Sequence, residues 1–297
     1  MRGMFDGYSH CEVTTSGARI AVWHAGVGPT LVLLHGHPQT HVMWHRVADT
    51  LAREFSVFAL DLRGYGDSSR LPAHPQHLWH SKRAMAQDVV EVMAHFGQRC
   101  FDVLAHDRGA RVAHRLALDH PDRVRRLMLL DIAPTLAMYE GTTRAFAQAY
   151  WHWFFLIQPA PLPERMIEAD PGFYVRQVMG QRTGGLSLFA PQALAAYERA
   201  MQRPGSAANV CEDYRASASI DLEHDRQDRA AGRRLAQPLR VLWGRHGTVG
   251  RCFDVLRLWR EVAEHVDGRA LEAGHYLAEE CPDEVLREAL HFFKENE

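Results

Sequence analysis

The chain has 297 residues, a formal net charge of −2 and 46% hydrophobic residues. This length fits one large α/β domain with an inserted subdomain, or two ordinary domains. The small charge gives no reason to expect binding to nucleic acid or an anionic membrane. Five scattered cysteines without a Cys-x-x-Cys motif argue against a disulfide framework or a zinc site. We therefore expect a cytoplasmic protein, without a signal peptide or a membrane span.

Strand and helix patterns alternate through the first 130 residues. Strands are expected over residues 19–23 (paired with the segment near Val13), 30–34, 55–60, 101–105 and 124–130. Helices are expected over residues 42–53, 84–96 and from Arg108 onward, with loops at 35–39 and 61–67. The run at 30–34 is apolar throughout, which is typical of a strand buried on both faces. The alternation predicts a mostly parallel sheet covered by helices on both faces.

The alternation stops near Pro134 and resumes near residue 235. The stretch between shows helical patterns and many prolines but no clear strand, so we expect a helical insertion, or cap, over residues 135–234. The remaining residues, 1–134 and 235–297, are expected to form one α/β core. Its last part holds a strand over 238–243, a helix over 253–262, a short strand near 269–271 and a final helix over 282–293.

Asp107 occupies the sharp turn between a buried strand and a helix. Ala105 and Gly109 lie two residues to either side, and small residues there let the backbone turn tightly enough to expose the side chain at the tip. A carboxylate in this position suggests attack on a saturated carbon and an ester intermediate on the protein. Alternatively, Asp107 caps the helix that starts at Arg108. The stretch alone does not separate these two interpretations.

Chain order favours the catalytic interpretation. A nucleophile at the turn, then an acid, then a late histidine is the order of an α/β-hydrolase triad. His275 lies in the loop before the final helix and is the expected base. The loop over residues 244–250 holds no carboxylate, so Asp131, at the carboxyl end of the strand over 124–130, is the expected acid.

Further segments complete a pattern that runs along nearly the whole chain: 35–40 (HGHPQT), 61–67 (DLRGYGD), 106–111 (HDRGAR), 130–131 (LD), 151–153 (WHW), Tyr214 and 274–275 (GH). The first two are only moderately specific, whereas Asp-Arg-Gly-x-Arg is sharp. With these motifs the chain resembles the α/β-hydrolase superfamily and, within it, the haloacetate dehalogenases, those acting on fluoroacetate in particular. One departure is His37, where the family often has Phe; because that loop acts through a backbone N–H, the change should be tolerated.

The resemblance implies a hydrolysis of fluoroacetate or another haloacetate to glycolate and halide through an ester on Asp107. Arg108 and Arg111 lie three residues apart at the start of one helix and can converge on the substrate carboxylate. The resemblance assigns the halide pocket to His152, Trp153 and Tyr214, and the oxyanion hole to the backbone N–H groups of His37 and Arg108. It implies no metal or organic cofactor, a small haloacid as ligand, and a homodimer.

Three alternatives stay open. Epoxide hydrolysis would use the same Asp and His, but it normally needs two cap tyrosines and has less use for an arginine pair. A small-molecule receptor on this fold would not need Asp107, Asp131 and His275 together. The four-residue spacing of His37, His41 and His45 could present a metal-binding face. However, no carboxylate or cysteine joins them, and Pro38 interrupts the first turn.

Overall fold

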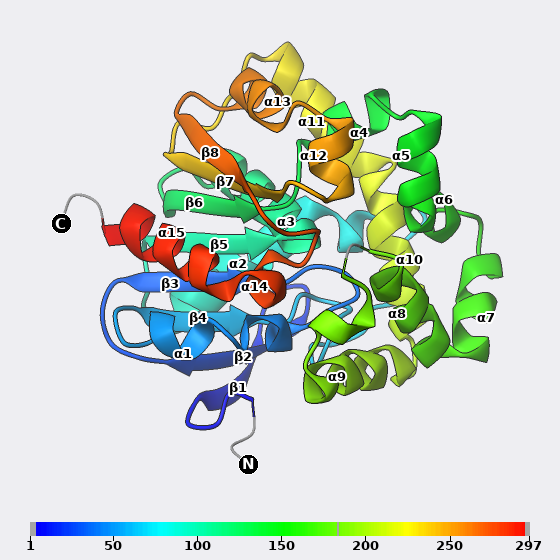
Figure 1. The fold of residues 1–297 in the computed structure, drawn as a ribbon, viewed down its shortest axis with the longest axis horizontal. Coiled ribbons are helices and arrows are strands. Elements are labelled where there is room, and N and C mark those ends of the chain that lie inside the picture. The colour runs from blue at the N-terminus through cyan, green and yellow to red at the C-terminus, as the bar shows by residue number, and fades with distance from the viewer. Residues whose placement is uncertain (1–3, 183, 295–297) are drawn as a thin grey trace.

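A computed structural model describes residues 4–182 and 184–294. Its centre is an eight-stranded sheet in the order β1-β2-β4-β3-β5-β6-β7-β8 (Figure 1). The strands are β1 Ser9–Thr14, β2 Arg19–Ala25, β3 Thr30–Leu34, β4 Ser56–Leu60, β5 Phe101–His106, β6 Val124–Leu130, β7 Leu239–Gly244 and β8 Val266–Leu271. β1 and β2 are antiparallel to their neighbours, and the other pairs are parallel. The predicted mostly parallel sheet is therefore confirmed.

The middle of the sheet is fully buried. Every residue of β3 and β5 is buried, as expected for strands covered on both faces. β3 has the same bounds as the apolar run that predicted it. The first hairpin pairs Val13 with Ile20, as the sequence indicated. Because β3, β5 and β6 are parallel neighbours, their carboxyl ends lie at one edge of the sheet, where the loops that carry chemistry gather.

Helices cover both faces of the sheet. In Figure 1, α1 and α15 lie in front of the sheet, and α2 and α3 lie behind it. The helices outside the long insertion are η1 His41–Trp44, α1 Ala48–Leu51, η2 Leu78–His80, α2 Lys82–His95, α3 Asp107–Asp119, α12 Thr248–Cys252, α13 Val255–Val262, α14 Leu277–Glu280 and α15 Pro282–Lys294. α2 packs directly against α3, which holds the start of α3 in a fixed place beneath the strand ends.

Helices alone follow β6 until the isolated bridge at Leu235, among the residues that the structure describes. They are α4 Thr135–Glu140, α5 Arg144–Ala149, α6 Trp151–Leu156, α7 Leu162–Ala169, α8 Pro171–Gly180, η3 Leu186–Leu188, α9 Pro191–Gln202, α10 Ser206–Ser217 and α11 Ile220–Ala230. Figure 1 places α4 to α10 at the right, beyond the carboxyl ends of the strands, and α11 at the top beside α13. Within the described ranges, no helix is long and apolar enough to cross a membrane.

One predicted helix is broken. Residues 42–53 form the short 3₁₀ helix η1 and the single turn α1 instead of one α-helix. The N–H of Val47 bonds to the carbonyl of Trp44, a three-residue step that continues the tighter winding. The apolar face was predicted well, because Trp44, Val47 and Leu51 are all fully buried. The periodicity identified the buried residues, while the β-branched and aromatic content disfavoured a regular helix.

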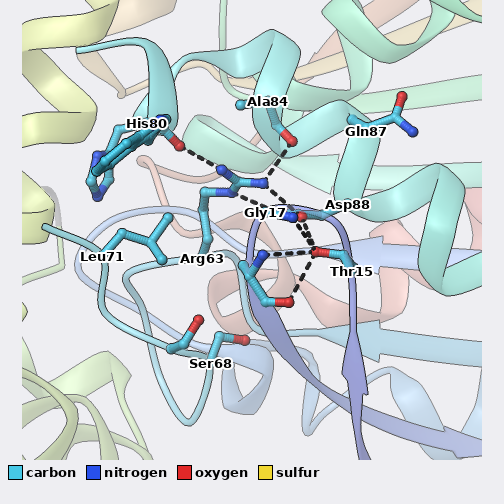
Figure 2. Close-up of polar contacts among 12 residues, drawn as sticks. Thr15, Gly17, Arg63, Ser68, Leu71, His80, Ala84, Gln87 and Asp88 are labelled. Atoms are coloured by element: carbon cyan, nitrogen blue, oxygen red, sulfur yellow. Dashed lines mark hydrogen bonds and ion pairs between the residues drawn. The ribbon is translucent and has the colours of Figure 1, made fainter. Parts of the chain in front are cut away.

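A buried ion pair fixes the loop that follows β4. The guanidinium of Arg63 donates two hydrogen bonds to Asp88 of α2, at 2.6 and 2.7 Å. It also donates to the carbonyls of Trp79 and Ala84, at 2.7 and 3.1 Å. The hydroxyl of Thr15 donates to the same Asp88 carboxylate at 2.6 Å (Figure 2). One cation thus ties the first hairpin, the loop over residues 61–67 and the start of α2 together.

We predict that Arg63→Leu lowers the free energy of unfolding by about 3–5 kcal/mol, because it leaves Asp88 buried without its counter-ion. The matched control is Arg19→Leu, which removes an ion pair to Glu12 whose side chains are 57% and 45% exposed. That change should cost less than about 1 kcal/mol. Urea denaturation of the three proteins measures the difference, and equal midpoints for the two variants would contradict the prediction.

Candidate active site

Asp107 stands at the sharp turn between β5 and α3. Its φ is +44°, a left-handed conformation that a residue with a Cβ adopts only under constraint. Two glycines allow the turn. A Cβ on Gly109 would lie 2.5 Å from the carbonyl oxygens of Leu34 and His35, and one on Gly36 would lie 2.6 Å from Cβ of Asp107. The structure therefore has the strand–turn–helix geometry that the sequence predicted for this stretch.

The two carboxylate oxygens of Asp107 have different surroundings. The backbone N–H of His37 donates to Oδ2 at 3.1 Å. Oδ1 makes no hydrogen bond with any residue in the ranges 4–182 and 184–294, so it is the oxygen left to react. Burial raises the pKa of Asp107, but His275 and His106, which are protonated at the low pH where Asp107 titrates, and the two nearby arginines lower it more. The net pKa lies well below its usual range, and the carboxylate is ionised.

His275 and Asp131 form a hydrogen-bonded pair beside this carboxylate. Nδ1 of His275 lies 2.6 Å from Oδ2 of Asp131. The other oxygen of Asp131 accepts the N–H of Gly244 at 2.9 Å, and Asp131 itself has a left-handed φ of +50°. Gly244 of β7, the first strand after the insertion, thus orients Asp131, which directly follows β6, the last strand before the insertion. The structure brings Asp107, Asp131 and His275 together, as their chain order predicted.

Burial sets the protonation of the His275–Asp131 pair. It raises the pKa of Asp131 above its usual range and lowers that of His275, to about 3. The Arg182 cation lowers the pKa of His275 further. His275 is therefore a neutral imidazole at rest and can accept a proton on Nε2, while Nδ1–H donates to Asp131.

Arg108 is completely buried, and most of its donors are already used. Its guanidinium donates to both carboxylate oxygens of Asp213, from Nε at 2.9 Å and from Nη2 at 2.8 Å. Nη2 also donates to the hydroxyl of Ser217 at 2.6 Å. Burial opposes the Arg108 charge, but Asp213 outweighs it and raises the pKa of Arg108 well above its usual value. Only Nη1 is left without a partner among the described residues, so Arg108 cannot bind an anion bidentately through two of its nitrogens.

Arg111 is held by neutral groups instead. Nη1 donates to the hydroxyl of Thr135 at 2.8 Å, and the guanidinium lies 4.8 Å from the centre of the Trp153 ring. Nε is buried and unpartnered within the described residues. The predicted arginine pair therefore offers one unpartnered nitrogen from each side chain, Nη1 of Arg108 with two N–H groups and Nε of Arg111 with one.

The three residues expected at a halide pocket lie together on α6 and α10. Rings of Trp153 and Tyr214 are 6.4 Å apart, and those of His152 and Tyr214 are 5.9 Å apart. Nε1 of Trp153 and the hydroxyl of Tyr214 are buried without a hydrogen-bond partner among the described residues. Buried donors are normally satisfied, so unmatched donors at one place indicate a missing acceptor.

Sequence reasoning missed three residues that shape this site. Asp213 neutralises Arg108 and also pairs with Lys82. Tyr150 places its ring 6.2 Å from that of His275, and its hydroxyl is unpartnered in the described part of the chain. Arg182 lies 4.2 Å over the Tyr150 ring. Tyr150 and Asp213 each lie next to a motif residue, Trp151 and Tyr214, but the motif does not include them, and all three reach the site through the packing of the insertion.

The histidine spacing that could have held a metal is used otherwise. His37 bonds to the hydroxyl of Tyr174 at 3.0 Å, His41 to Asp61 at 3.0 Å and His45 to the carbonyl of Val42 at 3.0 Å. Over residues 4–182 and 184–294, no group of three or more His, Cys, Asp or Glu side chains is placed to hold a metal ion.

The fold and this arrangement of residues agree with a family assignment. Residues 29–282 match the model of the alpha/beta hydrolase fold family, and the chain belongs to that family. A solved structure of a proposed alpha/beta hydrolase from Nostoc sp PCC 7120 superimposes with a TM-score of 0.96 and is 53% identical, covering 98% of this chain and 100% of the other.

Two curated relatives bear on the chemistry. Fluoroacetate dehalogenase of Burkholderia sp is 41% identical over 285 residues, which cover 96% of this chain and 93% of that protein. Soluble epoxide hydrolase of Corynebacterium sp. (strain C12) is 34% identical over 290 residues, which cover 96% and 97%. The chain is similar to both, so the resemblance to the dehalogenases is confirmed. Because the two relatives act on different substrates, the substrate class must be inferred from the residues of the site.

We predict that Gly109→Ala lowers the free energy of unfolding by about 1–3 kcal/mol or more. The new methyl group would meet backbone carbonyls that cannot move away. The control is Gly172→Ala in α8, where the added carbon would meet the end of the Arg176 side chain at 3.2 Å and Oδ1 of Asp170 at 3.5 Å, but no backbone atom among its three nearest neighbours. Alanine is favoured over glycine in helices by about 1 kcal/mol, so the control should be neutral or stabilising. Similar urea midpoints for both variants would contradict this account of the turn.

Proposed function

We propose that the protein hydrolyses small 2-haloacids, fluoroacetate or another haloacetate, to glycolate and halide through an ester on Asp107. One observation carries the proposal. Unpartnered buried donors on Arg108, Arg111, Trp153 and Tyr214 accompany an ionised Asp107. A substrate with one carboxylate and one leaving halide supplies the two acceptors that these donors lack. The similarity to fluoroacetate dehalogenase supports the same choice.

In the first step, Oδ1 of Asp107 attacks the α-carbon in line with the carbon–halogen bond. A carbon–oxygen bond forms, and the halide leaves with the bonding electron pair. N–H of Trp153, O–H of Tyr214 and an N–H of His152 would stabilise the departing halide, which matters most for fluoride because it is a poor leaving group. The free N–H groups of Arg108 and Arg111 would hold the carboxylate and so orient the α-carbon.

In the second step, Nε2 of His275 takes a proton from a water molecule whose oxygen attacks the ester carbonyl of Asp107. Asp131 holds the imidazole through Nδ1 and stabilises its positive charge. Backbone N–H groups of His37 and Arg108 would stabilise the oxyanion. Cleavage of the ester carbon–oxygen bond releases glycolate, which recovers the proton from His275. One oxygen of the regenerated carboxylate then comes from water.

The helical insertion, residues 135–234, would act as the cap that closes the site and excludes water. It carries the proposed halide donors, whereas the core, residues 1–134 and 235–297, carries Asp107, Asp131 and His275. The expected homodimer and cytoplasmic location stay predictions.

Epoxide hydrolysis is the second candidate, and one observation favours it. The hydroxyls of Tyr150 and Tyr214 are both buried and unpartnered among the described residues. Burial is the main cause that raises the pKa of each hydroxyl, and the charge of Asp107 also raises it. Two such hydroxyls could protonate an opening epoxide. The buried arginines argue for an anionic substrate instead, so a neutral epoxide such as 1,2-epoxyhexane separates the two candidates.

We predict that the wild-type protein releases halide from chloroacetate or fluoroacetate, and that Asp107→Asn lowers the rate at least about 10³-fold because it removes the attacking oxygen. A single turnover in ¹⁸O-water, followed by mass spectrometry, should place the label in Asp107. Label found only in glycolate would contradict the ester. Hydrolysis of the neutral epoxide without halide release would favour the second candidate.

We predict that Arg182→Gln moves the acid limb of kcat/KM for chloroacetate to higher pH. His275 must be deprotonated to act. Burial lowers the pKa of His275 most, and the Arg182 cation lowers it further. Without that cation the imidazole gains its proton at a higher pH, so activity is lost earlier on acidification. The measurement is a pH profile of both proteins, and superimposable acid limbs would contradict the electrostatic role.

A further inference from the structure

A second cavity opens beside the catalytic histidine. It lies between the end of α5, the residues that follow α8 and the short helix α12, and His275 forms part of its wall. α5 and α12 stand next to each other in Figure 1. The cavity volume is about 210 Å³. One water takes about 30 Å³ of liquid, so this is room for roughly seven waters, or for a further substrate segment of a few atoms.

The lining of this cavity is cationic. Arg182 and Arg251 line it with His275, and its other lining residues are Gln148, Ala149, Gln181, Gly247 and Thr248. None of these residues carries a carboxylate. Within the described residues, Arg182 and Arg251 form no ion pair, whereas Arg108 is neutralised by Asp213. The carboxylates of Asp107 and Asp131 lie close enough to Arg182 to interact with its charge, but neither lines the cavity, so the cavity wall itself carries only positive charge.

Arg182 is the residue that connects the cavity to the reacting groups. Its Nη1 is buried and has no hydrogen-bond partner in the part of the chain that the structure describes. Its Nη2 lies 3.5 Å from Nε2 of His152, and its guanidinium lies over the Tyr150 ring. A buried guanidinium N–H without an acceptor costs stability unless a ligand supplies one. An anionic group of the substrate that reaches Arg182 while the α-carbon faces Asp107 would supply this acceptor.

We propose that Arg182, with Arg251 at the same cavity, binds a second anionic group of the substrate, so that halogenated dicarboxylates are the preferred class of 2-haloacid. The proposal rests on the proposed function. The carboxylate next to the halogen-bearing carbon meets Arg108 and Arg111, and the distal carboxylate extends to Arg182. For 2-chlorosuccinate, Asp107 would form a bond to C2 as chloride leaves, and water would then release malate.

The first test compares 2-chlorosuccinate with 2-chlorobutyrate, which has a similar length and a neutral end, and with chloroacetate. At pH 8, the wild-type kcat/KM should be at least tenfold higher for 2-chlorosuccinate than for 2-chlorobutyrate. Arg182→Gln should abolish that preference mainly by raising KM for 2-chlorosuccinate, so that kcat/KM falls at least tenfold more for 2-chlorosuccinate than for chloroacetate. Arg182→Lys keeps the charge and should retain most of the preference. Arg257→Gln, on an exposed face of α13, is the matched control.

A binding measurement keeps this proposal separate from the proposed reaction. Calorimetry on the Asp107→Asn protein should give tighter binding for malate than for 2-hydroxybutyrate, and Arg182→Gln in that background should remove the difference. Equal affinities would overturn the second anion subsite, even if chloroacetate is dehalogenated. Failure of every haloacid to release halide would overturn the proposed function alone. An equal loss of rate for all three haloacids in Arg182→Gln would also overturn the subsite, because the arginine would then act on the reaction itself.

Discussion

The left-handed turn at Asp107 is the constraint on which the site depends. A φ of +44° costs a residue with a Cβ about 1–3 kcal/mol, and the surrounding packing must hold it in place. β5 supplies that packing because all six of its residues are buried, and the N–H of Gly109 bonds to the carbonyl of His35 at 2.9 Å. The turn exposes one carboxylate oxygen at the sheet edge where Asp131 and the loop of His37 also lie. Without it, the same carboxylate would cap α3 and face the helix amides.

Charge compensation is the second constraint, and it links the insertion to the core. Arg108 of α3 and Lys82 of α2 are both buried, and both pair with Asp213 of α10. The hydroxyl of Tyr65, in the loop after β4, donates to the same carboxylate at 2.6 Å. A buried cation is stable only with its counter-ion, so the core depends on the docked insertion for its electrostatic balance. The placement of the helices that carry Trp153 and Tyr214 is thereby coupled to Arg108, the arginine beside Asp107.

The sequence predicted what local pattern and chain order control. Asp107, Asp131 and His275 were found because each follows a strand of the parallel sheet, and parallel strands bring their carboxyl ends to one edge. The break in the helix at residues 42–53 and the added turn α12 were not predicted, because packing determines short elements more than sequence periodicity does. The roles of Asp213 and Arg182 were not predicted for a different reason. Their contacts join helices of the insertion to the core, and nothing near either residue in the chain specifies which helix face packs against the core.

The arginines show why a motif does not by itself define a binding mode. Two arginines three residues apart were expected to converge on one carboxylate, but Asp213 binds Nε and Nη2 of Arg108 and leaves only Nη1 unpartnered among the described residues. The neutralised Arg108 then acts mainly as a fixed donor. Arg111 and Arg182 are also buried, form no ion pair among the described residues, and share the charge of Asp107. They contact different aromatic rings, Arg111 that of Trp153 and Arg182 that of Tyr150. A substrate with two separated negative charges matches that division better than one with a single charge, because each cation then gains its own partner when water leaves the site.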